Sequence, residues 1–153
     1  MIDRTIPRKY GYWTNSADQG ITTPAGALRW GIDSSVGPHN SVRIVDTPGA
    51  GHTLDCDSLD LRWIVGFNSL GEGTTFTPMA PSSYSVNSCT TTLLDLTVES
   101  VPADQAVALS FSGTVTDVTV SDYNNSARVN EDGAERAFDA GTVRSIGGGT
   151  GGG

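Results

Sequence analysis

Hydrophobic and polar residues alternate along much of the chain, and the alternating segments are rich in threonine, valine and serine. A period of two sends successive side chains to opposite faces of an extended strand, which is typical of half-buried β-strands. The pattern predicts eight or nine strands, over residues 6–13, 27–33, 41–46, 59–67, 91–99, 106–112, 115–121, 126–130 and 134–140.

Turn-forming sequences separate these segments, with Thr-Pro-Gly at 47–49, Leu-Gly-Glu-Gly at 70–73, Pro-Ala-Asp at 102–104 and Glu-Asp-Gly at 131–133. The last favours a tight hairpin, because Asp-Gly accepts a positive φ. Helical periodicity is nearly absent, with at most a short turn at 15–19. Many short strands without intervening helices predict an all-β sandwich rather than a βαβ fold.

The large apolar residues of the predicted strands can fill the space between two sheets. We expect a core of Trp30, Ile32, Ile44, Trp63, Val65, Leu96, Val98, Leu109, Phe111, Val118 and Val120. We interpret their aromatic rings as packing groups rather than as a platform for a ligand. A chain of 153 residues suits one such domain, over residues 1–146. Residues 147–153 are glycine except Thr150 and predict a flexible linker or tail.

The charge balance excludes two classes of partner. Nine Lys and Arg against 17 Asp and Glu give a net charge of −8, so no basic face is available for nucleic acid or for an anionic membrane surface. No stretch approaches the roughly 20 apolar residues that span a bilayer. The first residues lack the apolar core of a signal peptide. We expect an extracellular domain whose signal peptide and anchor lie outside this chain, and we interpret its acidity as a means of solubility.

Cys56 and Cys89 are the two cysteines of the chain, and both stand beside strand-like segments. In an intracellular protein such a pair is more often two buried free thiols, whereas in an exported protein it is a disulfide. We favour the disulfide, because the rest of the chain has the character of an exported domain.

Groups suited to turnover chemistry are few. His39 and His52 lie in loop-like segments without partners at metal-ligand spacing, and no serine stands in a nucleophile-elbow sequence. Asp55, Asp57 and Asp60 invite comparison with a calcium loop, but they do not meet the spacing of an EF-hand. We therefore predict no metal, no cofactor and no enzyme activity in the usual sense.

Lys9 is the one lysine of the chain, and it lies in an aromatic segment, Arg-Lys-Tyr-Gly-Tyr-Trp at 8–13. Taken alone, it is most simply interpreted as a surface lysine. The order of motifs that follows it gives it a second interpretation.

Four segments, in order, carry a resemblance that spans most of residues 5–140. They are ALRWGID at 27–33, VRIVDTPGAGHTLD at 42–55, VALSFSGTVT at 107–116 and YNNSARV at 123–129. Together with a lysine in the first strand, they resemble the collagen-adhesin type of bacterial cell-surface domain. The resemblance implies an immunoglobulin-like β-sandwich. The chain departs from the pattern at His52, where glutamine is more typical, in the long segment before Trp30, and in its cysteine pair.

Many members of that family contain an isopeptide bond that forms spontaneously between a lysine and an asparagine with the help of an acid. By position, the resemblance implies Lys9 as the amine, Asp46 as the acid and Asn125 as the amide. Asn124 is the alternative amide, and strand alternation allows only one of the two to face the core. Considered singly, Asp46 also suits a turn cap and Asn125 an Asx hydrogen bond.

Two functions are compatible with the resemblance. The first is a structural stalk or adhesin domain, joined to neighbouring domains of the same surface protein and stabilised by the Lys–Asn cross-link. The second is a binding module for a host extracellular matrix protein, collagen-like in kind, or for a glycan.

Overall fold

The computed structural model describes residues 7–13, 28–117, 119–120, 122–139 and 143–144 of the chain. The strands are β1 (Arg8–Trp13), β2 (Leu28–Asp33), β3 (Val42–Pro48), β4 (His52–Leu54), β5 (Asp60–Phe67), β6 (Gly73–Pro78), β7 (Tyr84–Cys89), β8 (Leu94–Val98), β9 (Ala106–Val115), β10 (Asp122–Tyr123), β11 (Asn125–Glu131), β12 (Ala134–Asp139) and β13 (Val143–Arg144). Two 3-10 turns, η1 (Cys56–Ser58) and η2 (Pro81–Ser83), are the helical elements of this part of the chain. None of its helices is long and apolar enough to cross a membrane.

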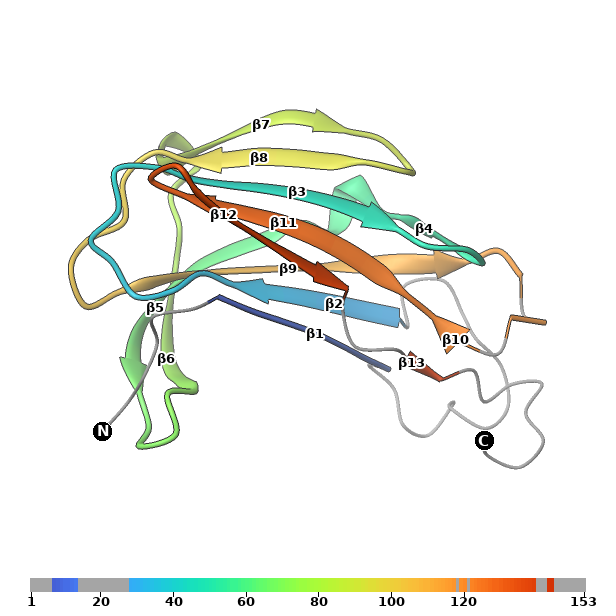
Figure 1. The fold of residues 1–153 in the computed structure, drawn as a ribbon, viewed down its shortest axis with the longest axis horizontal. Coiled ribbons are helices and arrows are strands. Elements are labelled where there is room, and N and C mark those ends of the chain that lie inside the picture. The colour runs from blue at the N-terminus through green and yellow to red at the C-terminus, as the bar shows by residue number, and fades with distance from the viewer. Residues whose placement is uncertain (1–6, 14–27, 118, 121, 140–142, 145–153) are drawn as a thin grey trace.

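The strands form two antiparallel sheets that face each other (Figure 1). The first has the order β1-β2-β9-β5-β6, with β4 also paired to β9, and the second has the order β12-β11-β3-β8-β7. β10 and β13 make a separate two-stranded ladder. The predicted all-β, immunoglobulin-like sandwich is confirmed. Strands from the two ends of the chain lie in opposite sheets, β1 at one edge of the first and β11 inside the second.

The core lies between the sheets and follows the period-two pattern. Its residues are Leu28, Trp30, Ile32, Val42, Ile44, Leu54, Leu61, Met79, Leu94, Leu96, Val98, Val101, Val107, Leu109, Phe111, Tyr123, Ala127 and Val129. Of the predicted core residues that the structure describes, all but three are confirmed as buried core. Trp63 and Val120 pack against the core while only partly buried. Val65 is exposed, because a register irregularity between Ile64 and Gly66 breaks the alternation of β5. Val118 lies outside the described residues.

The strand predicted at 115–121 is wrong over the part that the structure describes. Val115 ends β9, and the backbone N–H groups of Thr116 and Asp117 then donate to the Gly51 carbonyl. Asp117 accepts a hydrogen bond from the Thr119 backbone, which favours a turn. The short turn expected at 15–19 and the tail at 147–153 fall outside the described residues.

β6 and β7 were not predicted, and both are edge strands. Most of their side chains are exposed, so serine and threonine occupy both faces and no alternation marks them. The hairpin predicted at 131–133 is confirmed, since Asp132 and Gly133 have φ of 53° and 93° and join β11 to β12.

The disulfide between Cys56 and Cys89 is confirmed, with a sulfur–sulfur distance of 2.06 Å. It joins η1, which contacts β9 of the first sheet, to the end of β7 in the second sheet. The bridge therefore fastens one sheet of the sandwich to the other.

Candidate functional site

Lys9 points into the core from an edge strand. It pairs in register with Ile32 of β2, and its neighbours Tyr10 and Tyr12 take the outer face. The Lys9 side chain is 1% exposed, and its Nζ lies 5.5 Å from the centre of the Trp30 ring and 5.8 Å from that of Phe111. A lysine so deeply buried requires a partner for its charge.

That partner is Asp46, which comes from the opposite sheet. Val42, Ile44 and Asp46 are the inward residues of β3, so the carboxyl stands where the pattern would place a third apolar residue. The Lys9 Nζ donates to Asp46 Oδ2 at 2.9 Å, and the Asp46 side chain is fully buried. Its second oxygen, Oδ1, is buried without a hydrogen-bond partner.

Asn125 lies beside Asp46 on the neighbouring strand. β11 pairs with β3 so that Ala127 is opposite Asp46 and Asn125 is opposite Pro48, and both β11 residues face inward. Asn125 and Asp46 are thus diagonal neighbours on one face of the sheet. Asn124 is exposed, whereas Asn125 is only 1% exposed.

The Asn125 amide has no completed hydrogen bond at either its nitrogen or its oxygen. It does act on Asp46 and lowers the pKa of that carboxyl, so the two groups are close although their geometry falls short of a full hydrogen bond. Buried polar atoms are nearly always paired in folded proteins, which makes this pair of orphan atoms unusual.

Burial shifts both charged groups toward their neutral forms. Desolvation lowers the pKa of Lys9, against the attraction of Asp46. Desolvation also raises the pKa of Asp46, and this outweighs the opposing effect of the Lys9 charge. The site therefore favours a neutral amine beside a protonated acid more than water does.

His52, to which the sequence assigned no function, packs against the same group of side chains. It is 5% exposed at the start of β4 and accepts a hydrogen bond at Nε2 from Trp30 Nε1, at 3.2 Å. Burial lowers the pKa of His52, and the nearby Lys9 charge lowers it further. The signal that could have found it is the departure from glutamine at this position.

His39 lies at the other end of β11, in a cluster with Ser35, Glu131 and Asp132. Its Nε2 is 3.1 Å from the Ser35 carbonyl and its Nδ1 is 3.3 Å from Asp132 Oδ2. Ser35 donates to Glu131 from both its backbone N–H and its hydroxyl, each at 2.7 Å. Ser35 is buried and its hydroxyl proton is already engaged, so the cluster fastens a loop to the β11–β12 hairpin.

Two of the three aspartates considered for calcium are occupied in other ways. Asp55 accepts a hydrogen bond from Thr114, and Asp60 pairs with Arg62. The described ranges contain no group of three histidine, cysteine, aspartate or glutamate residues that could hold a metal ion.

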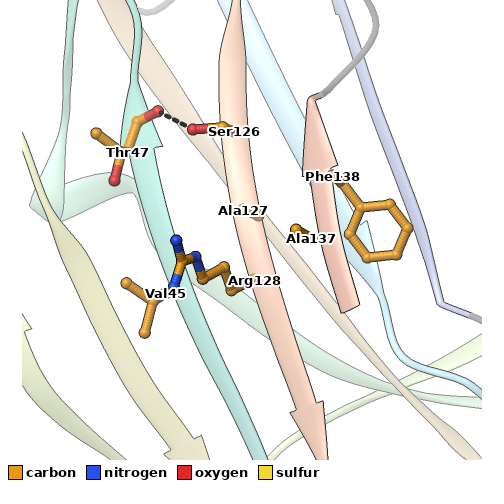
Figure 2. A pocket seen from close by; sticks show the side chains of 7 residues that line it. All are labelled: Val45, Thr47, Ser126, Ala127, Arg128, Ala137 and Phe138. Atoms are coloured by element: carbon orange, nitrogen blue, oxygen red, sulfur yellow. Dashed lines mark hydrogen bonds between the residues drawn. The ribbon is translucent and has the colours of Figure 1, made fainter. Parts of the chain in front are cut away.

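A shallow pocket lies on the outer face of the second sheet, over β3, β11 and β12 (Figure 2). Its lining consists of Val45, Thr47, Ser126, Ala127, Arg128, Ala137 and Phe138. On β3 and β11, side chains alternate between the two faces of the sheet. Four lining residues take the face opposite to Asp46 and Asn125, namely Val45, Thr47, Ser126 and Arg128. Among the lining residues Arg128 carries the one charge, and it is 3.9 Å from Glu135, so the pocket offers no pair of groups for chemistry.

Comparisons with known proteins find similarity of structure alone. No family model matches the sequence, and no curated protein matches it. The fold is similar to ACE19, the collagen-binding subdomain of the Enterococcus faecalis surface protein ACE, with a TM-score of 0.69 and 15% identity over 93% of this chain and 98% of that one.

Two further structures show the same architecture. The collagen adhesin CNA from S. aureus matches with a TM-score of 0.63 and 13% identity over 92% of this chain and 49% of its own. The pilus backbone protein RrgB from Streptococcus pneumoniae matches with a TM-score of 0.54 and 12% identity over 82% of this chain and 31% of its own. The chain therefore has the fold of Cna-type adhesin domains and spans half or less of these two longer relatives.

Proposed function

We propose that this chain is a structural domain of a bacterial surface protein, stabilised by an isopeptide bond that forms spontaneously between Lys9 and Asn125 with Asp46 as the assisting acid. The observation that carries the proposal is the buried Lys9–Asp46 pair beside a buried Asn125 whose amide atoms have no hydrogen-bond partner. Likeness to surface adhesins and to a pilus backbone supports an extracellular position among neighbouring domains of the same protein. The disulfide fits that oxidising location.

The proposed reaction is an amide exchange within one chain. Neutral Lys9 Nζ attacks the side-chain carbonyl carbon of Asn125, while protonated Asp46 donates a hydrogen bond to the carbonyl oxygen and polarises it. The carbon–nitrogen bond of the amide then breaks, and the nitrogen leaves as ammonia with the proton that the amine gives up. Fixed contact between the groups supplies an effective concentration that free solution lacks.

Such a bond would strengthen the domain against mechanical pulling. β1 is an edge strand of the first sheet, held there by pairing with β2, and β11 lies inside the second sheet. A covalent link between them would join the first strand to a strand near the end of the domain, across the core. Load passing between Lys9 and Asn125 would then be carried by a covalent bond, and the strands between these two residues would be shielded from it.

Intact mass of the reduced protein tests the proposal, because loss of ammonia lowers it by roughly 17 Da. Lys9→Met, which keeps an apolar side chain of similar length, should restore the full mass. Asn124→Ala is the matched control, since it alters the exposed neighbour of Asn125 and should keep the loss. A full mass for the folded wild-type domain would end the proposal.

A second candidate function is binding of a host matrix protein, collagen-like in kind, or of a glycan. The outer face of the first sheet favours it, because Tyr10 and Tyr12 are 41% and 47% exposed with stacked rings 6.3 Å apart. Tyr10 covers Gly31, where any added side chain would collide with its ring. Collagen-peptide and glycan binding by the wild type and by Tyr12→Ser tests this candidate, and absence of binding by the folded wild type favours the stalk.

A further inference from the structure

Trp30 connects two polar side chains of the core. Its ring face lies toward Lys9, with Nζ 5.5 Å from the ring centre, and its Nε1 edge donates to His52. The orientation of the indole therefore determines both contacts at once. A change at His52 can reach the lysine through one rigid ring.

The contact with Trp30 determines the protonation state of His52. An indole N–H can only donate, so His52 Nε2 must act as an acceptor and carry no proton. The neutral ring then has its proton on Nδ1, which is buried without a completed hydrogen bond. The Ala50 backbone acts on the ring and raises its pKa, but burial lowers it by more.

The His52 ring is also confined. Tyr123 of β10 meets it edge-on with ring centres 5.9 Å apart, and a Cβ added at Gly113 of β9 would come within 3.0 Å of its Cδ2. Among the described residues, the Lys9 charge on β1 acts on the ring and Tyr123 on β10 contacts it, and the Tyr123 hydroxyl donates to the Asp117 carbonyl. Protonation at Nε2 would break the Trp30 bond and bring a second positive charge near Lys9.

We infer that His52 is a positioning residue for the cross-link: in its neutral form it holds the Trp30 indole, whose face supports the Lys9 amine for attack on Asn125. The inference rests on the proposed function and deepens it. A small displacement of reacting groups can cost up to about 100-fold in rate. Loss of the His52 acceptor should therefore slow bond formation without removing any of the three reacting groups.

The experiment starts from unfolded protein that has been kept in denaturant since its synthesis, so that the bond has not formed. Folding is started by dilution into a series of buffers from about pH 8 to about pH 4, and formation of the bond is followed in each. Samples are quenched at intervals and weighed after reduction, and tryptophan fluorescence gives the folded fraction at each time. His52→Gln retains an acceptor for Trp30 without a titrating group, and His52→Leu removes the acceptor. Dividing the wild-type rate by that of His52→Gln removes the part of the Lys9 and Asp46 titration that the two proteins share.

We expect His52→Gln to react within about threefold of the wild type near neutral pH and His52→Leu at least about tenfold more slowly. The ratio of wild type to His52→Gln should fall in acid, as His52 becomes protonated in the folded domain. Equal rates for wild type and His52→Leu, or a ratio that is constant with pH, would overturn the inference. A wild type that never loses ammonia would instead refute the proposed function.

Discussion

The two ends of β11 carry polar clusters of opposite kinds. At Glu131, every contact is complete: the carboxylate accepts two hydrogen bonds from Ser35, and the adjacent Asp132 accepts from the backbone of Asn40 and Ser41. At Asn125, both amide atoms are buried and unpaired beside the Lys9–Asp46 ion pair. Both ends are polar, and they differ in whether hydrogen bonding is satisfied.

On the proposed function, this difference separates an architectural cluster from a reactive one. A satisfied cluster has little to gain from a change in covalent structure, whereas unpaired buried polar atoms cost about 1–3 kcal/mol each. Converting the amine and the amide into one neutral amide would remove a buried charge and an unsatisfied group together. Each cluster also has its own histidine. The ring nitrogens of His39, in the satisfied cluster, face oxygen acceptors, whereas His52, near the Lys9 cluster, accepts a hydrogen bond from an indole.

The largest effect is expected from Asp46→Ala, compared with Asn125→Ala as a second variant that cannot form the bond. Removing the carboxylate leaves the Lys9 amine buried without its partner, which costs about 3–5 kcal/mol in free energy of unfolding. Urea denaturation measures this difference. The double variant Lys9→Met and Asp46→Leu should recover most of the lost free energy of unfolding. A double variant as unstable as Asp46→Ala would show that the loss comes from packing and not from the unpaired amine.

Loss of the disulfide should rank next. Cys56→Ser with Cys89→Ser opens a bridge between residues 33 positions apart and should cost about 3–4 kcal/mol by chain entropy. The bridge is distinct from the Lys9 cluster, so the reduced mass should still show loss of ammonia. A variant that folds but keeps the full mass would show that the cross-link depends on the bridge.

The pH dependence of Asn125→Ala should reveal the uncoupled pair. Because the folded pKa of Asp46 lies above its ordinary value of 3.8, stability should fall as pH rises from that value through the folded pKa. Because the folded pKa of Lys9 lies below 10.5, stability should rise again as pH approaches that value. The reference protein carries Lys9→Met and Asp46→Leu in addition to Asn125→Ala. The difference in free energy of unfolding between Asn125→Ala and this reference should pass through a minimum at a pH between the folded pKa values of Asp46 and Lys9. A flat difference would contradict both shifts.

The smallest effect is expected at the satisfied end of β11. Ser35→Ala removes a hydroxyl donor to Glu131 and should cost about 1–3 kcal/mol, the range for a buried acceptor left unpaired. The variant should lose ammonia as completely as the wild type. Failure of the cross-link in a folded Ser35→Ala protein would mean that the two ends of the strand are coupled.

Sequence alone was sufficient for the parts of the molecule that alternation controls. The sandwich, most of its core and the 131–133 hairpin followed from period two and from Asp-Gly. Edge strands β6 and β7 escaped prediction because their exposed faces are polar on both sides. Val65 was misplaced because no local signal marks the irregularity in β5.

The candidate site was also predicted only in part. The three positions that the resemblance implied, Lys9, Asp46 and Asn125, are all buried, and their roles in a cross-link stay a prediction. The contact between His52 and Trp30 joins residues 22 positions apart through side-chain geometry, which no spacing rule captures. Tertiary packing, rather than local pattern, determined that part of the site.

Peptide mapping tests the central claim most directly. After reduction and proteolysis, the account predicts that the peptide containing Lys9 and the peptide containing Asn125 travel as one species, lighter than their sum by roughly 17 Da, with fragment ions that place the link on these two side chains. Two separate peptides of unmodified mass, from protein shown to be folded, would contradict it.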